Sequence, residues 1–280
     1  MGWLPWKYST ALAVVFLVSF LLARGRQERH WKFVASFCAE ASILSVLYTL
    51  WALGGKLSGL EIDGAISRGE WLWEFERTLR LPNEKTWQEA LTPYSFPTQA
   101  ANVYYFAAHV PAMGVFLFWL FVRHRASFPK WRNNLAMLTG ASLFIQLIPV
   151  APPRLVDSLG VIDTGLAYDQ SVYGTFGYEI AAQLQAMPSI HVGWAAVIGW
   201  ASWIESSSHW RWVGAFHAVV TFYVVAVTGN HYWMDGIVAI MLMVAFYPLA
   251  KMIAAWSNSL RRVEQPEPDP DDRQKLTVAA

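Results

Sequence analysis

Long apolar runs constrain this chain more than any other feature of its sequence. Most of them approach the roughly 20 residues that a helix needs to cross the hydrocarbon core of a bilayer. Hydrophobic residues make up 55% of the 280 residues and charged residues only 15%. The runs begin near Ala11, Phe33, Val103, Asn134, Ser189, Val213 and Tyr232. We therefore predict an all-α fold, a polytopic bundle of transmembrane helices with about six or seven crossings.

The chain divides into three predicted parts. Residues 1–101 provide N-terminal membrane helices and an extracytoplasmic interfacial segment, residues 102–255 form the membrane core, and residues 256–280 form a tail. Prolines alternate with acids toward the C-terminus, and such a segment cannot bury enough apolar area to fold. We expect this tail to be disordered.

The interfacial segment contains a predicted helix between Glu61 and Leu81. Leu72, Phe75 and Leu79 share one face of it, which indicates a helix that lies on the membrane surface. A solvated helix without membrane contact explains the pattern equally well.

Basic residues predict the orientation, because short cytoplasmic loops accumulate Lys and Arg. They cluster after the first, third and last runs, as Arg24, Arg26, Arg29, Lys32, Arg123, Arg125, Lys130, Arg132, Arg261 and Arg262. In a seven-crossing chain these clusters lie on one side. We expect a multi-pass protein of the plasma (cell) membrane with a cytoplasmic C-terminal tail and with segments 55–102 and 151–188 outside.

The charge balance narrows the range of partners. A formal net charge of +1, with no basic stripe along the chain, argues against a nucleic-acid partner. Membrane lipids are the expected surroundings. The sequence predicts no particular oligomeric state.

His231 and Asp235 are four residues apart at the start of the last apolar run. On a helix they share one face, so the carboxylate can fix the tautomer of the imidazole and stabilise its charged form. A polar pair that merely packs inside the bundle is the alternative. Because ionisable groups at membrane depth are costly and usually functional, we select this pair as catalytic candidates.

Pro188, Ser189, His191 and Gly193 open the fifth run. Proline suits the first turn of a helix, and a serine hydroxyl beside unpaired N–H groups forms an anion site there. The alternative is a capping serine with a histidine that reaches the membrane interface. Arg154 begins the preceding loop, where its planar fork could hold phosphate oxygens, whereas we interpret the later Asp163 as solvated. Three distant elements thus converge on one predicted membrane face.

Two motifs carry a family resemblance. Pro188, Ser189, Ile190 and His191 match the motif Pro-Ser-x-His, and the segment from His231 to Asp235 matches His-x-x-x-Asp. In this ordered pair the sequence resembles the type 2 phosphatidic acid phosphatase (PAP2) superfamily, which has a PAP2/haloperoxidase-like fold. Within it the sequence resembles the branch similar to inositol phosphorylceramide synthases, over about residues 102–254.

The resemblance implies a covalent mechanism without a cofactor or a metal. His231 would attack phosphorus, Asp235 would orient it, and His191 would protonate the leaving alcohol and then activate the acceptor. Ser189 and nearby N–H groups, including that of Gly193, would bind the substrate phosphate.

The sequence also departs from the family pattern. Val224 and Val225 stand where the superfamily commonly places Ser-Arg ahead of the last histidine, and the Lys-x-x-x-x-x-x-Arg-Pro element is absent as such. Arg154, in a Pro-Pro-Arg context like that of the synthase branch, is the proposed replacement.

Asn102, Tyr105 and His109 are weaker candidates that lie near the outer end of the third run. Their spacing places them roughly on one side of a helix, where they could line a headgroup pocket. A satisfied set of hydrogen bonds between helices is an equal alternative.

These features predict a membrane lipid-phosphate phosphatase that acts at the extracytoplasmic face on a lipid or polyprenyl phosphate. The same chemistry would serve a phosphotransferase that passes a phosphoryl headgroup to a second alcohol. A non-catalytic transporter or lipid-binding protein is the alternative from another class.

Overall fold

The computed structural model describes residues 5–54, 62–171 and 183–263. Its helices are α1 Trp6–Ala23, α2 Arg29–Gly54, α3 Ile62–Thr78, α4 Glu84–Leu91, α5 Ser95–Ala107, α6 His109–Arg123, α7 Phe128–Ile145, η1 Pro153–Leu155, η2 Asp157–Leu159, α8 Thr164–Ala167, α11 Ile190–Glu205, α12 Trp210–Val227 and α13 Trp233–Val263. The described residues contain no strand, only an isolated bridge between Val150 and Gln185. The all-α prediction is confirmed.

Among the described residues, four helices are long and apolar enough to cross a membrane: α1, most of α2, α12 and most of α13. A fifth crossing is possible if α5 and α6, which meet at 52°, form one broken span. The predicted count of six or seven is not confirmed. Helix α11 has 16 residues and is therefore only about 24 Å long, and α7 carries Lys130 and Arg132 near its start.

Helices α7 and α11 form the centre of the bundle with α13. Asn134 of α7 donates a 2.9 Å hydrogen bond to the main-chain oxygen of Met243 on α13. Trp194 of α11 donates at 2.9 Å to the hydroxyl of Thr139 on α7. A polar side chain that bonds across the interface holds helices together where water is excluded, so α7, α11 and α13 form one packed unit.

Helices α1 and α2 form a hairpin beside this unit. Ser42 donates to the main-chain oxygen of Ala13 at 3.0 Å inside the hairpin. Glu40 of α2, a buried carboxylate within a long apolar helix, pairs with Arg132 of α7. The ion pair joins the hairpin to the rest of the bundle.

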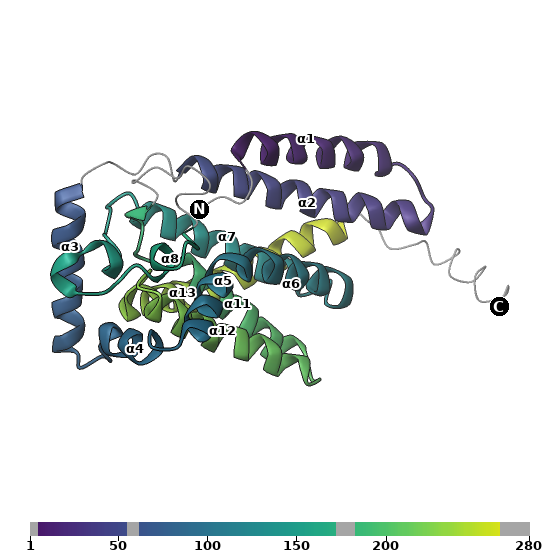
Figure 1. Cartoon of the computed structure of the whole chain (residues 1–280). Coiled ribbons are helices and arrows are strands. Elements are labelled where there is room, and N and C mark those ends of the chain that lie inside the picture. The colour runs from purple at the N-terminus through teal and green to yellow at the C-terminus, as the bar shows by residue number, and fades with distance from the viewer. Residues whose placement is uncertain (1–4, 55–61, 172–182, 264–280) are drawn as a thin grey trace, which may run out of the picture.

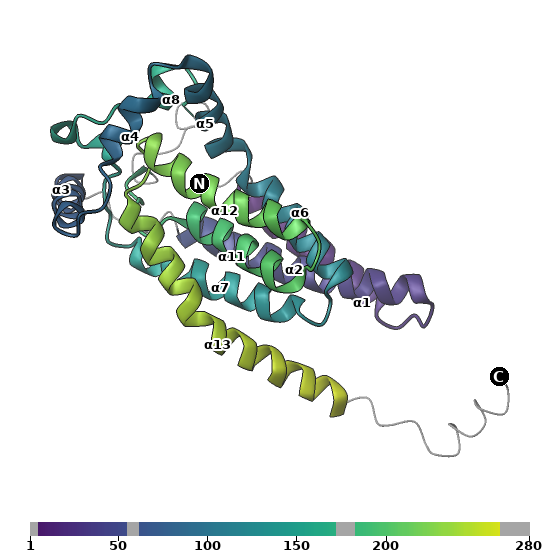
Figure 2. The same cartoon turned by 90° about the horizontal axis from the view of Figure 1, so that it is seen from below.

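Helices α3, α4 and α8 gather at one end of the bundle, as Figures 1 and 2 both show. The helix expected near residues 61–81 is present as α3, with Leu72 and Trp73 buried and Trp71 exposed. Its buried face packs on a cluster that includes Tyr232, directly before α13. We call this end of the bundle the site end.

Helix α13 continues through residues 256–263, which we had assigned to the tail. These residues contain no proline or glycine to end the helix; the first proline is Pro266. The rest of the predicted tail, residues 264–280, lies outside the described residues.

Candidate active site

The loop between α12 and α13 brings His231 to the site end. Gly229 adopts a φ of +71°, a left-handed conformation that side chains disfavour. The N–H groups of Asn230 and His231 both donate to the main-chain oxygen of Val225, at 3.1 and 3.0 Å. The loop is thereby fixed, and the imidazole of His231 is buried with only 3% of its surface exposed.

The hydrogen bonds of His231 define its tautomer. Nδ1 lies 2.8 Å from the main-chain oxygen of Ala186 and 3.2 Å from Oδ2 of Asp235. A carbonyl oxygen can only accept, so Nδ1 carries the hydrogen. Nε2 has no hydrogen-bond partner among the described residues, and in the neutral ring it holds the available lone pair.

Three acidic side chains occupy the N-terminus of α13. Asp235 accepts from the N–H of Tyr232 at 2.9 Å, Glu84 from that of Trp233 at 3.2 Å, and Glu76 from that of Met234 at 2.6 Å. All three are fully buried. Because these N–H groups are taken and the local charge is negative, a phosphate cannot bind at this helix start.

Glu76 and Glu84 are held together by Arg77. Its guanidinium lies 3.2 Å from Glu76, 3.1 Å from Glu84 and 4.6 Å from the ring centre of Trp73. Burial, and then the neighbouring carboxyl of Glu84, raise the pKa of Glu76 to about 10. Glu76 is therefore protonated at neutral pH, which removes the repulsion between two buried negative charges.

The start of α11 lies beside the start of α13. The main-chain N–H of Ser189 donates to the main-chain oxygen of Asp235 at 3.0 Å, and the Ser189 hydroxyl caps α11 by accepting from Val192 at 3.3 Å. The N–H of Gly193 donates to the main-chain oxygen of Ser189. Gly193 is thus not available to phosphate; it instead permits close packing, since a Cβ there would lie 3.0 Å from Leu138.

His191 lies against the ring of His231. Their ring centres are 5.7 Å apart, and those of His191 and Tyr105 are 4.5 Å apart. The ring of His109 meets that of His191 edge to face at 4.4 Å. The two motif histidines are thus brought together by two helix starts, with α5 and α6 behind them.

Arg154 reaches the loop that carries His231, although it has many partners already. Its Nε donates to the side-chain oxygen of Asn230 at 3.0 Å, one terminal nitrogen to Asp163 at 2.9 Å, and both terminal nitrogens to Gln183 at 3.3 Å. Its N–H donates to the oxygen of Gly229 at 3.0 Å. Arg154 therefore braces this loop, and Asp163, which we expected to be solvated, is only partly exposed and pairs with Arg154.

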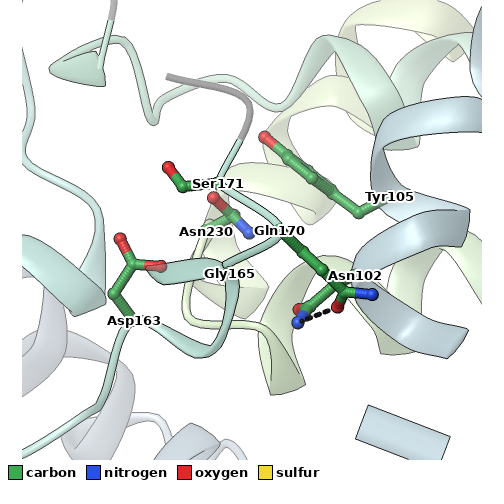
Figure 3. A pocket seen from close by; sticks show the side chains of 7 residues that line it. All are labelled: Asn102, Tyr105, Asp163, Gly165, Gln170, Ser171 and Asn230. Carbon is green, nitrogen blue, oxygen red and sulfur yellow. Dashed lines mark hydrogen bonds between the residues drawn. The ribbon is translucent and has the colours of Figure 1, made fainter. Parts of the chain in front are cut away.

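A small pocket, open to solvent, lies beside this loop. Figure 3 shows its lining of Asn102, Tyr105, Asp163, Gly165, Gln170, Ser171 and Asn230. Asn102 donates to Gln170 at 3.1 Å and accepts from the hydroxyl of Thr164 at 2.7 Å. Two of the three expected pocket residues, Asn102 and Tyr105, are among these seven, whereas His109 lies against His191.

The sequence did not reveal Glu76, Glu84 or the oxygen of Ala186 as parts of the site. Glu76 and Glu84 look like ordinary surface acids among Glu74 and Glu89, and a main-chain oxygen leaves no trace in a sequence. In the described residues, no group of three or more His, Cys, Asp or Glu side chains is arranged to hold a metal ion.

The bundle and the site together define a class: a membrane protein with a paired histidine site, supported by a buried aspartate, at one end of its apolar helices. The family model of the PAP2 superfamily matches residues 70–249, and the chain belongs to this superfamily. Membership indicates a phosphatase-type function on lipid phosphates. The match does not identify a branch. No curated protein and no solved structure matches the chain.

Proposed function

We propose that the protein is a membrane lipid-phosphate phosphatase that forms a phosphohistidine on His231. The observation that carries this proposal is the protonated Nδ1 of His231, held by Ala186 and Asp235. It leaves Nε2 as the nucleophilic nitrogen beside His191, and a nucleophile oriented by a buried carboxylate is the arrangement that covalent catalysis needs.

The reaction has two steps. In the first, Nε2 of His231 bonds to phosphorus, the bond from phosphorus to the leaving oxygen breaks, and that oxygen takes a proton from His191. In the second, water gives a proton to His191, its oxygen bonds to phosphorus, and the electron pair of the P–N bond returns to Nε2. Asp235 stabilises the positive charge on His231 between the steps.

The phosphate would bind at the start of α11. The first N–H groups of a helix lack helical partners, and those of Ile190 and His191 lie beside the Ser189 hydroxyl. Together they would stabilise the charge on the phosphoryl oxygens in the transition state. Arg154 would contribute only if Asp163 or Gln183 released its guanidinium when the substrate bound.

The substrate would be a lipid or polyprenyl phosphate at the extracytoplasmic face of the plasma membrane. Apolar helices around the site suit a buried tail, and the loop charges favour an outward site end and a cytoplasmic tail. These two arguments support a headgroup that enters from the outer surface.

A phosphotransferase is a second candidate, and the pocket beside Asn230 favours it. Amide, hydroxyl and carboxyl side chains line this pocket, and such groups bind hydroxyl-bearing molecules through directed hydrogen bonds. An acceptor alcohol held there would replace water in the second step, as the resemblance to inositol phosphorylceramide synthases implies.

The test uses purified protein with labelled phosphatidate, a sphingoid phosphate and a polyprenyl diphosphate, each with and without inositol or glycerol. Wild type should release phosphate, His231→Ala and His191→Ala should not, and acid-labile label should be trapped on His231. Transfer of label to the alcohol would identify the transferase. Unchanged turnover in both variants would refute the proposed site, and binding without turnover would favour a transporter or lipid-binding protein.

A further inference from the structure

His109 occupies an unusual position behind His191. Only 5% of its surface is exposed, yet neither ring nitrogen has a hydrogen-bond partner among the described residues. A buried polar atom without a partner costs free energy. An apolar ring would fill the same space without that cost, so the imidazole calls for an explanation in function.

A bend between helices α5 and α6 puts His109 in this position. Helix α5 ends at Ala107, α6 begins at His109, and the two meet at 52°. Pro111 has no N–H to donate to the main-chain oxygen of Ala107, and its ring would clash with that oxygen in a continuous helix. The break is thus dictated by the sequence, and it presents His109 from the first turn of α6.

The ring of His109 touches titratable groups on three helices. His191 on α11 lies at 4.4 Å between ring centres, His217 on α12 at 5.9 Å, and Tyr104 on α5 at 6.3 Å. The main chain of His191 lies close enough to the His109 ring to affect it, although without the geometry of a hydrogen bond, and His231 acts on the ring electrostatically.

His217 differs from His109, because the hydroxyl of Tyr104 bonds its Nδ1 at 2.6 Å. That bond accounts for the polarity of His217 within the bundle. His109 has no comparable bond, and its nearest ring is that of the proposed proton donor.

We propose that His109 is a positioning residue for His191, whose imidazole it holds between its own ring and the ring of Tyr105. The inference rests on the proposed phosphatase function. His109 touches neither substrate nor phosphorus; it acts through His191, so it affects the steps in which His191 gives or takes a proton.

Two substrates separate those steps. When the P–O bond breaks, short-chain phosphatidate releases a diacylglycerol whose oxygen needs the proton of His191. In contrast, 4-nitrophenyl phosphate releases 4-nitrophenolate, a stable anion that needs no proton. With 4-nitrophenyl phosphate the first turnover, seen as a burst of nitrophenolate, is independent of His191. The later hydrolysis of phosphohistidine still needs His191 to take a proton from water.

The variants are His109→Phe, which keeps a ring and removes its polarity, and His109→Gln, which keeps a donor and an acceptor. His124→Phe is the matched control, since His124 follows the opposite end of α6. We expect His109→Phe to lower phosphatidate kcat by tenfold or more at unchanged KM, to keep the nitrophenolate burst within twofold of wild type, and to slow the later turnover. His109→Gln should recover part of the loss.

Thermal unfolding provides the second measurement. His109→Phe should be at least as stable as wild type, because it removes an unsatisfied buried polar group. The inference is overturned if His109→Phe keeps full phosphatidate turnover, if it loses the burst together with turnover, or if activity falls only in proportion to stability. His231→Ala tests the proposed function separately. If this variant loses all activity, the phosphatase proposal stands even where the inference about His109 is overturned. If its activity is unchanged, the phosphatase proposal is itself refuted.

Discussion

Nδ1 of His231 donates a 2.8 Å hydrogen bond to the main-chain oxygen of Ala186. This bond holds the tautomer independently of Asp235, which lies farther away at 3.2 Å. The orientation of the proposed nucleophile is therefore set twice, once by a carbonyl that cannot be mutated and once by a carboxylate that can.

Asp235→Asn should consequently be less harmful than the same change in a site where the carboxylate alone selects the tautomer. Such a change lowers kcat by about 10⁴-fold in the Ser-His-Asp triad, where it gives the wrong tautomer, and here we expect a loss of about 10²- to 10³-fold, mostly from the missing charge on the transition state. Phosphate release at saturating substrate measures it. A loss as complete as that of His231→Ala would show that Ala186 does not hold the ring.

Gly229→Ala should damage both stability and activity. At a φ of +71° an L residue costs about 1–2 kcal/mol, and a Cβ would lie 2.9 Å from Val161 and 3.1 Å from Cβ of Arg154. The strain would move the loop that carries His231. Thermal unfolding and phosphate release measure the two effects.

Gly140→Ala is the control for that substitution. Gly140 lies in α7, and a Cβ there would meet nothing within 4 Å. Since alanine is about 1 kcal/mol more favourable than glycine inside a helix, Gly140→Ala should match or exceed wild-type stability. If Gly229→Ala and Gly140→Ala had the same melting temperature and the same phosphate release, the conformation of residue 229 would not be what positions His231.

Local contacts were the predictable part of this protein. The pairing of His231 with Asp235 follows from a spacing of four residues, and the capping of α11 by Ser189 follows from the residues around a helix start. Both depend on neighbours in the chain. The all-α fold was equally accessible, because apolar runs of this length favour helices.

Contacts between distant segments were not predictable. Glu84 and Glu76 reach α13 across 149 and 158 residues, and no periodicity encodes such pairing. The count of six or seven crossings is not confirmed, because an apolar run in a sequence does not show where its helix begins and ends. Helix α11 is apolar and packed inside the bundle, with Val197 and Ala201 fully buried, and its 16 residues are fewer than the roughly 20 of a typical crossing.

Glu76→Gln should change the pH dependence of stability. The folded protein keeps the Glu76 proton up to about pH 10, whereas the exposed carboxyl loses it near the ordinary value of 4.5. Between these values the folded state binds more protons than the unfolded state, so stability falls as pH rises. Glutamine has no proton to lose. Near about pH 5 the two proteins should be similar, and near about pH 9 the variant should melt a few degrees higher.

Glu74→Gln, an exposed change on the same helix α3, should leave the melting temperature within about one degree of wild type at both pH values. Tryptophan fluorescence follows unfolding in detergent. Parallel pH curves for wild type and Glu76→Gln would mean that Glu76 is ionised in the folded protein.

The proposed orientation can be tested with two introduced cysteines. Leu166, in α8 at the site end, is 68% exposed, and Ser207 is exposed in the connection between α11 and α12. The positive-inside rule places the first outside and the second in the cytoplasm. A membrane-impermeant maleimide should label Leu166→Cys in intact cells and Ser207→Cys only after lysis, while wild type stays unlabelled because Cys38 is buried. The reverse labelling pattern would place the histidine site on the cytoplasmic side and would exclude substrates presented at the outer surface.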